Sequence, residues 1–244
     1  MERGERVSGD HPLGVLFDID DTLVDLEGAM GATLHEIADE GLSHLSDDDW
    51  IEYKRLYARD PERHYDSFLQ GKATFTEQRI RRVAHARAGF TAVPFDAEAA
   101  AGWNRAYEST LPRHFKAYDD VVPLLDELDE RGIPYGVISN NVHDYQRAKL
   151  DRAELSRIRI LVGIDALDVA KPDPAIFLEG VRLLGTPPAR TLYVGDNPVV
   201  DAHGADAAGL VGVWLDRAGL EIEDGPQRRI STLSAVLQFL PPVR

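Results

Sequence analysis

The stretch Gly14–Leu23 constrains the fold most strongly, because a short apolar run there ends abruptly in carboxylates. The continuous apolar run Val15–Phe17 predicts a buried strand of a parallel sheet. Ligands of open α/β sheets bind beyond the carboxyl ends of strands, where Asp18 and Asp20 would lie. Side chains alternate along an extended segment, so both carboxylates point to one side and favour a bound cation or a shared proton. The alternative is a solvated acidic turn.

After Tyr118, strand-like apolar runs alternate with helical patterns. This alternation predicts an α/β fold in which helices cover both faces of a parallel sheet through right-handed crossovers. Asp173 followed by Pro174 predicts a helix start, and Gly185 predicts the end of that helix. The expected strands cover residues 133–138, 158–162, 191–194 and 211–215, and the expected helices cover 119–130, 174–184, 201–208 and 233–240, with another beginning near 141–144.

Residues 26–115 show helical spacing and contain no convincing strand. Because this stretch separates the first strand from the others, we predict a helical domain inserted into a core formed by residues 1–25 and 116–244. The polar segment Met1–Pro12 is expected to fray. The expected helices of the insert cover residues 26–42, 46–60, 74–88 and 96–107.

The composition excludes several functions. Lys and Arg number 27 against 42 Asp and Glu, and the resulting charge of −15 disfavours a general binder of nucleic acids or anionic membranes. The chain has no cysteine, which excludes zinc–thiolate sites and cysteine nucleophiles. Neither a secretory signal nor an apolar run of membrane-spanning length is present, so we predict a cytoplasmic protein. We also expect the protein to be a monomer or a homodimer.

Three further polar clusters lie near predicted strand ends. Ser139-Asn140 follows a strand and would offer an anion site or a plain helix cap. Lys171 precedes a helix, where a lysine alone is usually a surface charge. Gly195-Asp196, followed by Asp201, would reach toward a cation or form a simple turn.

Together, the four clusters suggest phosphoryl chemistry. Asp18 and Asp196 supply the hard oxygen ligands that Mg²⁺ prefers, and the Asp20 carbonyl could add a third. The Ser139 hydroxyl and the Lys171 ammonium would hold phosphoryl oxygens. With no cysteine and no paired-histidine pattern, a carboxylate is the expected nucleophile.

In order and spacing, these clusters resemble the four motifs of the haloacid dehalogenase-like (HAD) hydrolase superfamily. The resemblance runs from Gly14 to about Arg217 and implies a Rossmann-like core. The helical insert resembles the family's alpha-helical cap, the C1 type, in the phosphatase branch. The motifs are Asp18-Ile19-Asp20-Asp21-Thr22, Ser139-Asn140, Lys171-Pro172 and Gly195-Asp196 with Asp201.

This resemblance implies a Mg²⁺-dependent phosphatase acting on a small phosphorylated metabolite. Asp18 would be the nucleophile, and Asp20 would protonate the leaving group and then activate water. Mg²⁺ would be bound by the Asp18 side chain, the Asp20 carbonyl and Asp196. The remaining implied roles are hydrogen bonds from Thr22 and Ser139 to the phosphate or the nucleophile, substrate binding by Ser139, Asn140 and Lys171, and support from Gly195 and Asp201.

Four alternatives stay open at this point. A 2-haloacid dehalogenase would attack carbon, and its family pattern lacks the second aspartate, which Asp20 supplies here. A phosphonate hydrolase would need a cap lysine, and nothing marks Lys54 or Lys72 as one. A phospho-aspartate signalling module would be about half this length, and a catalytically silent binding protein would have lost a motif residue.

The predicted cap concentrates basic residues between Lys54 and Arg87. Some of them, with His64 or Tyr65, would face the active site and select a second anionic group, or they would form a solvated helix face. Trp50, Trp103 and the cap tyrosines are expected in the cap core, and hinges are expected near 24–27 and 115–118. The basic residues are Lys54, Arg55, Arg59, Arg63, Lys72, Arg79, Arg81 and Arg82.

Overall fold

The structure is a computed structural model that describes residues 12–220 and 225–241 of the 244-residue chain. It divides into two compact units, one formed by the described residues up to Val24 and from Ala117 on, and the other by Asp25–Lys116. Apart from Pro12, the N-terminal tail that we expect to fray lies outside the described residues. No helix in the described ranges is both long and apolar enough to cross a membrane.

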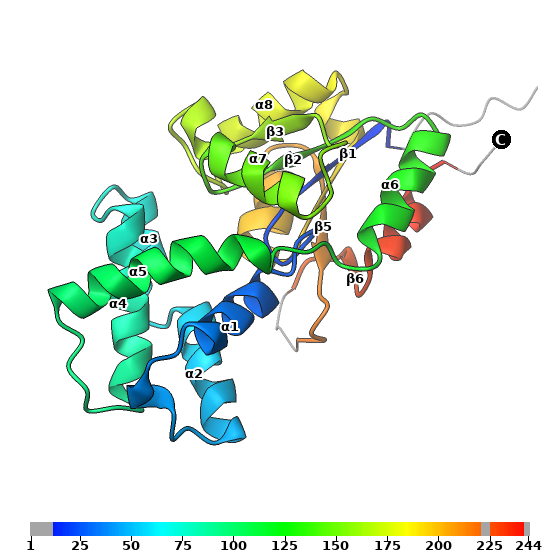
Figure 1. The fold of residues 1–244 in the computed structure, drawn as a ribbon. Coiled ribbons are helices and arrows are strands. Elements are labelled where there is room, and N and C mark those ends of the chain that lie inside the picture. The colour runs from blue at the N-terminus through cyan, green and yellow to red at the C-terminus, as the bar shows by residue number, and fades with distance from the viewer. Residues whose placement is uncertain (1–11, 221–224, 242–244) are drawn as a thin grey trace, which may run out of the picture. The chain divides into compact units, whose positions relative to one another are not determined.

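A parallel sheet of six strands organises the first unit (Figure 1). Its strand order is β3-β2-β1-β4-β5-β6, so the first strand of the sequence lies in the middle of the sheet. The predicted parallel Rossmann-like sheet is therefore confirmed, with the two-residue β6 as an addition that the sequence did not suggest. The strands are β1 (Gly14–Phe17), β2 (Tyr135–Ile138), β3 (Ile160–Val162), β4 (Thr191–Gly195), β5 (Val211–Leu215) and β6 (Arg229–Ile230).

The central strand β1 is buried on both faces. Leu16 belongs to an apolar cluster with Phe177 of α8 (Pro174–Leu184), which packs against β1, β2 and β3. Val15 and Phe17, which point to the opposite face, are also fully buried. This double burial explains why β1 is continuously apolar up to the point where Asp18 begins the site.

The other helices of the first unit are α6 (Val121–Glu130), α7 (His143–Arg152) and α9 (Gly204–Ala207). Two of the predicted helices differ from expectation. The helix expected over 201–208 is instead a π-helical turn, Pro198–His203, followed by the short α9. The last segment, Leu233–Phe239, is a 3₁₀ helix, and Leu240 becomes extended because Pro241 disfavours a helical residue before it.

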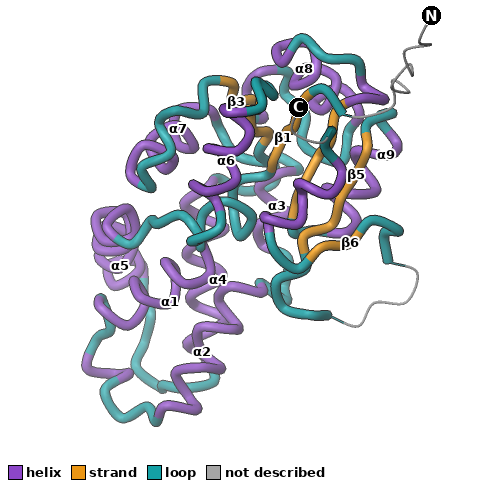
Figure 2. Tube along the Cα trace, turned by 90° about the vertical axis from the view of Figure 1, so that its right-hand side faces the viewer, coloured by secondary structure: helices purple, strands orange, loops and turns teal. Residues whose placement is uncertain are grey.

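The second unit contains helices and no strand, and all of its residues are described (Figure 2). Predicted cap residues start two of its helices, because the side chains of Ser46 and Thr74 form capping boxes with Asp49 and Glu77. The helices are α1 (Leu26–Glu36), α2 (Asp47–Arg59), α3 (His64–Leu69), α4 (Phe75–Ala88) and α5 (Ala97–Thr110).

Two details of this unit depart from the sequence prediction. The helix expected over 26–42 ends at Glu36, and a separate 3₁₀ turn begins after Asp39, whose side chain accepts from the Gly41 amide. The six-residue α3 was not predicted, since its short span carries no clear periodicity. As expected, Trp103 and the tyrosines at 53, 57 and 107 are buried, whereas Trp50 and Tyr65 are only partly buried.

Candidate active site

The site forms where two neighbouring strands end. The Asp18 amide donates to the Val194 carbonyl at 2.9 Å, which places the residue after β1 beside the end of β4. In the sheet, β2 and then β3 lie on one side of β1, whereas β4 and then β5 lie on its other side. The order of the strands therefore reverses between β1 and β4. Ligands bind at such a switch point of an open α/β sheet.

A tight turn after Asp18 brings Thr22 back toward β4. Asp21 adopts a left-handed conformation with φ of 57°, and the Val24 amide donates to the Ile19 carbonyl at 2.9 Å. Thr22 Oγ1 accepts from the Asp196 amide at 3.0 Å and donates to Asp196 Oδ1 at 3.4 Å. The Thr22 side chain therefore fixes the loop after β1 to the loop after β4.

Lys171 lies between two carboxylates. Its Nζ is 2.5 Å from Asp18 Oδ1 and 2.7 Å from Asp201 Oδ1, and it donates to the Tyr193 hydroxyl at 2.9 Å. Burial alone would lower the pKa of Lys171, but the charges of Asp18 and Asp201 raise that pKa well above its ordinary value. The two carboxylates therefore favour the charged form of Lys171 beside Asp18.

The loop after β4 aims Asp201 inward. Asp201 lies in the π-helical turn Pro198–His203, and its Oδ2 accepts from the Asn197 amide at 3.0 Å. π-Helical turns often occur at functional sites. A Cβ added to Gly195 would lie 2.4 Å from Asp201 Cγ, so only glycine allows this close approach.

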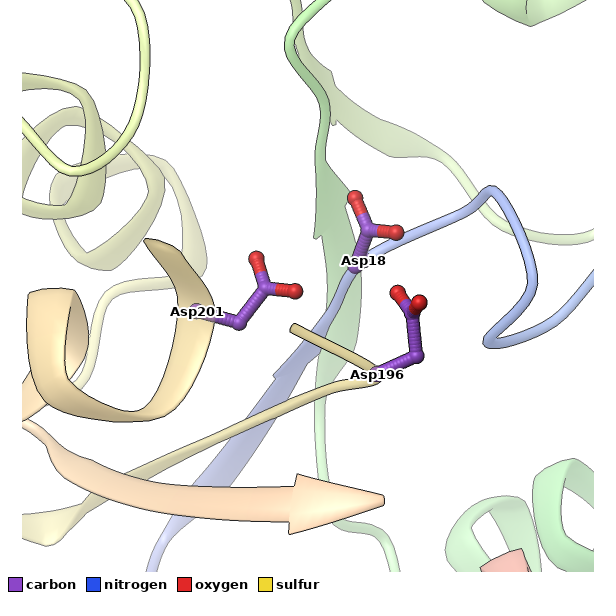
Figure 3. A group of neighbouring side chains, drawn as sticks. All are labelled: Asp18, Asp196 and Asp201. Carbon is purple, nitrogen blue, oxygen red and sulfur yellow. The ribbon is translucent and has the colours of Figure 1, made fainter. Parts of the chain in front are cut away.

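Asp18, Asp196 and Asp201 form a cluster that suits a metal ion (Figure 3). One oxygen from each carboxylate lies within 4.8 Å of the others. Burial raises the pKa of Asp18 to about 7, against the opposing effect of Lys171. Burial and the charges of Asp18 and Asp201 also raise the pKa of Asp196 well above its ordinary value. This excess of buried negative charge and the all-oxygen donor set fit a hard divalent cation.

Ser139 and Asn140 follow β2, next to β1. Both polar atoms of the Asn140 side chain bind the backbone of Lys171: Oδ1 accepts from its amide at 2.6 Å and Nδ2 donates to its carbonyl at 2.9 Å. Asn140 therefore positions the Lys171 loop. Ser139 is buried, and its hydroxyl accepts from Gln146 at 2.6 Å.

Sequence reasoning missed several side chains that contact the predicted site. Gln146 and Lys149 of α7 both contact the Asp20 carboxylate. Tyr193 contacts Lys171, and Trp214 Nε1 donates to the Asp196 carbonyl at 2.9 Å. The two aromatic residues stood out only as apolar strand residues, whereas the spacing of Gln146 and Lys149, three residues apart, would have placed them on one helix face.

The structure corrects the hypothesis for two basic cap residues. Arg79 is buried and donates to Asn104 at 3.1 Å and to Glu108 at 2.9 Å. Arg82 is buried and donates to the Tyr57 carbonyl at 2.6 Å. Neither is a solvated surface charge or free to select a substrate, because both are bonded inside the helical unit.

These features define an α/β protein with a cluster of carboxylates at a switch point of its parallel sheet. Residues 13–209 match the haloacid dehalogenase-like hydrolase family, and the chain therefore belongs to this family of hydrolases.

Individual proteins of this family are similar to the chain in sequence or in structure. The chain is 32% identical over 213 residues to the glyceraldehyde 3-phosphate phosphatase of Methanopyrus kandleri, covering 83% of each protein. It is 23% identical to the (S)-2-haloacid dehalogenase H-109 of Pseudomonas putida, covering 93% of this chain and 97% of that enzyme. The solved structure of the HAD-hydrolase YfnB from Bacillus subtilis, bound to magnesium, has the same fold, with a TM-score of 0.76 at 22% identity over 94% of this chain and 99% of YfnB.

Proposed function

We infer that the chain is a Mg²⁺-dependent phosphatase that hydrolyses a small phosphomonoester through an aspartyl phosphate on Asp18. The observation that carries this inference is the position of Asp18, whose carboxylate contacts Lys171 and lies within the cluster of Asp196 and Asp201. An anionic nucleophile can approach an anionic phosphate only where cations offset their repulsion.

The reaction proceeds in two halves. In the first, an Asp18 oxygen forms a bond to phosphorus while the bond to the ester oxygen breaks, and a proton passes from Asp20 to the leaving alkoxide. In the second, Asp20 accepts a proton from water as the water oxygen bonds to phosphorus. The bond between phosphorus and Asp18 then breaks, which releases inorganic phosphate and restores the free carboxylate.

The carboxylates of Asp18 and Asp196 would hold Mg²⁺ together with the Asp20 carbonyl, with Asp201 beside them. When bound, the ion supplies positive charge that offsets the repulsion between phosphate and carboxylates and polarises the phosphoryl group.

The remaining predicted residues have supporting roles in this proposal. Lys171 neutralises charge on Asp18 and the phosphate, and Ser139 donates to a phosphoryl oxygen. Thr22 holds the loop that carries Asp196. Asn140 acts through the Lys171 backbone, and Gly195 leaves the space that Asp201 occupies.

The proposed substrate is a small phosphorylated metabolite. The name of the phosphatase relative, 32% identical over most of the chain, supports this class. The second candidate is 2-haloacid dehalogenation, which the haloacid dehalogenase relative favours. Asp20 argues against it, because an alkoxide leaving group needs a proton and a halide does not. A cytoplasmic location and a monomeric or homodimeric state stay predictions from the sequence.

The decisive experiment measures phosphate release from a panel of phosphomonoesters, with Mg²⁺ or with a chelator, alongside halide release from 2-chloropropionate. We expect Mg²⁺-dependent phosphate release that Asp18→Asn lowers by ~10⁴-fold or more. Asp144→Asn, which removes the same charge from a fully exposed side chain, is the matched control and should retain activity. Halide release without phosphate release would replace the phosphatase proposal with the dehalogenase one.

A further inference from the structure

The Asp20 carboxylate is held by two side chains from one helix. Gln146 Nε2 donates to Asp20 Oδ2 at 2.9 Å, and the Lys149 ammonium forms an ion pair with Asp20 Oδ1. Both residues lie on α7, three positions apart, which places them on the same face of the helix. Each oxygen of Asp20 therefore has its own donor.

The burial of Lys149 points to a purpose beyond packing. Its side chain is only 1% exposed, whereas that of Asp20 is 27% exposed. Lysines are almost never fully buried unless they are paired, and a buried ion pair contributes little net stability because desolvation opposes it. The chain thus holds a desolvated cation directly against the carboxylate that must exchange protons.

Gln146 extends the arrangement to the predicted phosphate site. Its Nε2 also donates to Ser139 Oγ at 2.6 Å, so one amide group joins Asp20 to Ser139. Its buried Oε1 has no hydrogen-bond partner among the described residues. Such an orphaned acceptor costs stability, but turning the amide over would place that oxygen against the Asp20 carboxylate, which has no proton to donate to it. The orientation of Gln146 is therefore set by Asp20.

We propose that Lys149 and Gln146 are positioning residues that hold the Asp20 carboxylate where it can exchange protons with the leaving group and with water. This proposal rests on the phosphatase function inferred above. A carboxylate oxygen has two lone pairs, so one donor on each oxygen leaves a site for the transferred proton. Proton transfer requires hydrogen-bond reach to the reacting oxygen, which a freely rotating Asp20 would satisfy only part of the time.

The kinetic test compares two classes of ester in Lys149→Met. An alkyl phosphate needs a proton on its leaving oxygen, whereas 4-nitrophenyl phosphate does not. We expect kcat/KM for the alkyl ester to fall ~10²-fold and that for 4-nitrophenyl phosphate to change less than ~3-fold. Lys149→Arg should restore most of the alkyl activity. Gln146→Glu, which replaces the donor with an acceptor, should lose more than Gln146→Leu.

Combining Lys149→Met with a substitution of Asp20 separates a positioning role of Lys149 from a structural role. In an Asp20→Asn background, adding Lys149→Met should lower activity no further, because the residue acts only through Asp20. The matched control is Arg152→Met, an exposed cation removed from the same helix, which should behave as wild type. An equal loss on both ester classes, or full additivity with Asp20→Asn, would overturn the proposal.

A crystal structure provides a readout that does not depend on turnover. In Lys149→Met and in Gln146→Leu, we expect the Asp20 carboxylate to leave its wild-type position, and an unmoved carboxylate would also overturn the proposal. If wild type releases no phosphate from any ester, the phosphatase function fails, whereas the positions of Asp20 in these crystals still decide whether the two residues hold it.

Discussion

Both units of the molecule bury cations, but they bond them to different partners. In the sheet-containing unit, Lys149 and Lys171 contact the carboxylates of Asp18, Asp20 and Asp201 at the strand ends. In the helical unit, Arg82 donates to backbone carbonyls, whereas Arg79 and Arg87 pair with the carboxylates of Glu108 and Asp39, whose side chains are about half exposed. The burial of the carboxylate partner, more than that of the cation, therefore distinguishes the candidate site, because Asp18 and Asp201 are buried whereas Glu108 and Asp39 are half exposed.

The chemistry of the two side chains fits this division. The planar guanidinium of Arg82 binds the Tyr57 carbonyl with two nitrogens and lies 4.6 Å from the Tyr57 ring, so it satisfies carbonyls at the end of α2. A lysine ammonium is a compact charge that suits one or two carboxylates. The arginines thus hold helices together, and the lysines hold negative charge in the site.

The largest effect that this comparison predicts is on activity in Lys171→Met. Removing the cation leaves Asp18 and Asp201 buried without their partner, so we expect phosphate release to fall ~10³-fold or more. The exposed Lys72→Met is the control for loss of a lysine. Steady-state kinetics on the best ester of the panel would show this, and activity near that of wild type would break the link between carboxylate-bonded lysines and the reaction.

A smaller effect, on stability, is expected in Arg82→Met. The variant leaves buried carbonyls at the end of α2 unsatisfied and should lower the free energy of unfolding by about 2–4 kcal/mol. The neighbouring Arg81→Met removes the same charge from an exposed position of the same helix and should change it little. Denaturant unfolding measures both. Loss of kcat per folded molecule in Arg82→Met, without loss of stability, would contradict the structural role.

The sequence predicts the carboxylate half of this site well and the supporting half poorly. Asp18 and Asp196 directly follow continuously apolar strands, so the strand pattern alone places them at the carboxyl edge of a sheet. Gln146 and Lys149 lie on a mostly polar helix with a single large aliphatic residue, Leu150, and only the packing of α7 shows that they are buried. Arg79 and Arg82 read as surface charges for the same reason, because a sequence does not show which side of a polar helix meets its neighbours.

The stability of the metal-free protein should depend on pH through Asp18. The pKa of Asp18, raised from 3.8 to about 7, means that the folded protein binds a proton that the unfolded chain releases. This contribution to stability is present below pH 4 and is lost as pH rises through about 7. Metal-free Asp18→Asn should therefore be more stable than wild type at pH 8 and should lose this advantage at pH 4.

Adding Mg²⁺ to the same measurement tests whether Asp18 belongs to the cation site. An ion that binds only the folded state adds stability, so saturating Mg²⁺ should raise the Tm of wild type at pH 8 and raise that of Asp18→Asn less. Thermal unfolding at both pH values, with Mg²⁺ or with a chelator, gives the four comparisons. Equal shifts in both proteins would mean that Asp18 does not belong to the cation site, and the excess negative charge would then need another explanation.

The smallest expected effect concerns a cation of the helical unit that is not buried. Arg63 is 80% exposed, and its Nε donates to Asp66 Oδ2 at 2.6 Å three residues later. Exposed ion pairs contribute little, so Arg63→Ala should change the free energy of unfolding by less than ~0.5 kcal/mol. We also expect KM and kcat to stay within about twofold of wild type across acidic phosphate esters. A KM that rises only for esters with a second anionic group would restore the substrate-selection hypothesis for this residue. It would also show that the helical unit uses its exposed cations for recognition while it uses its buried ones for structure.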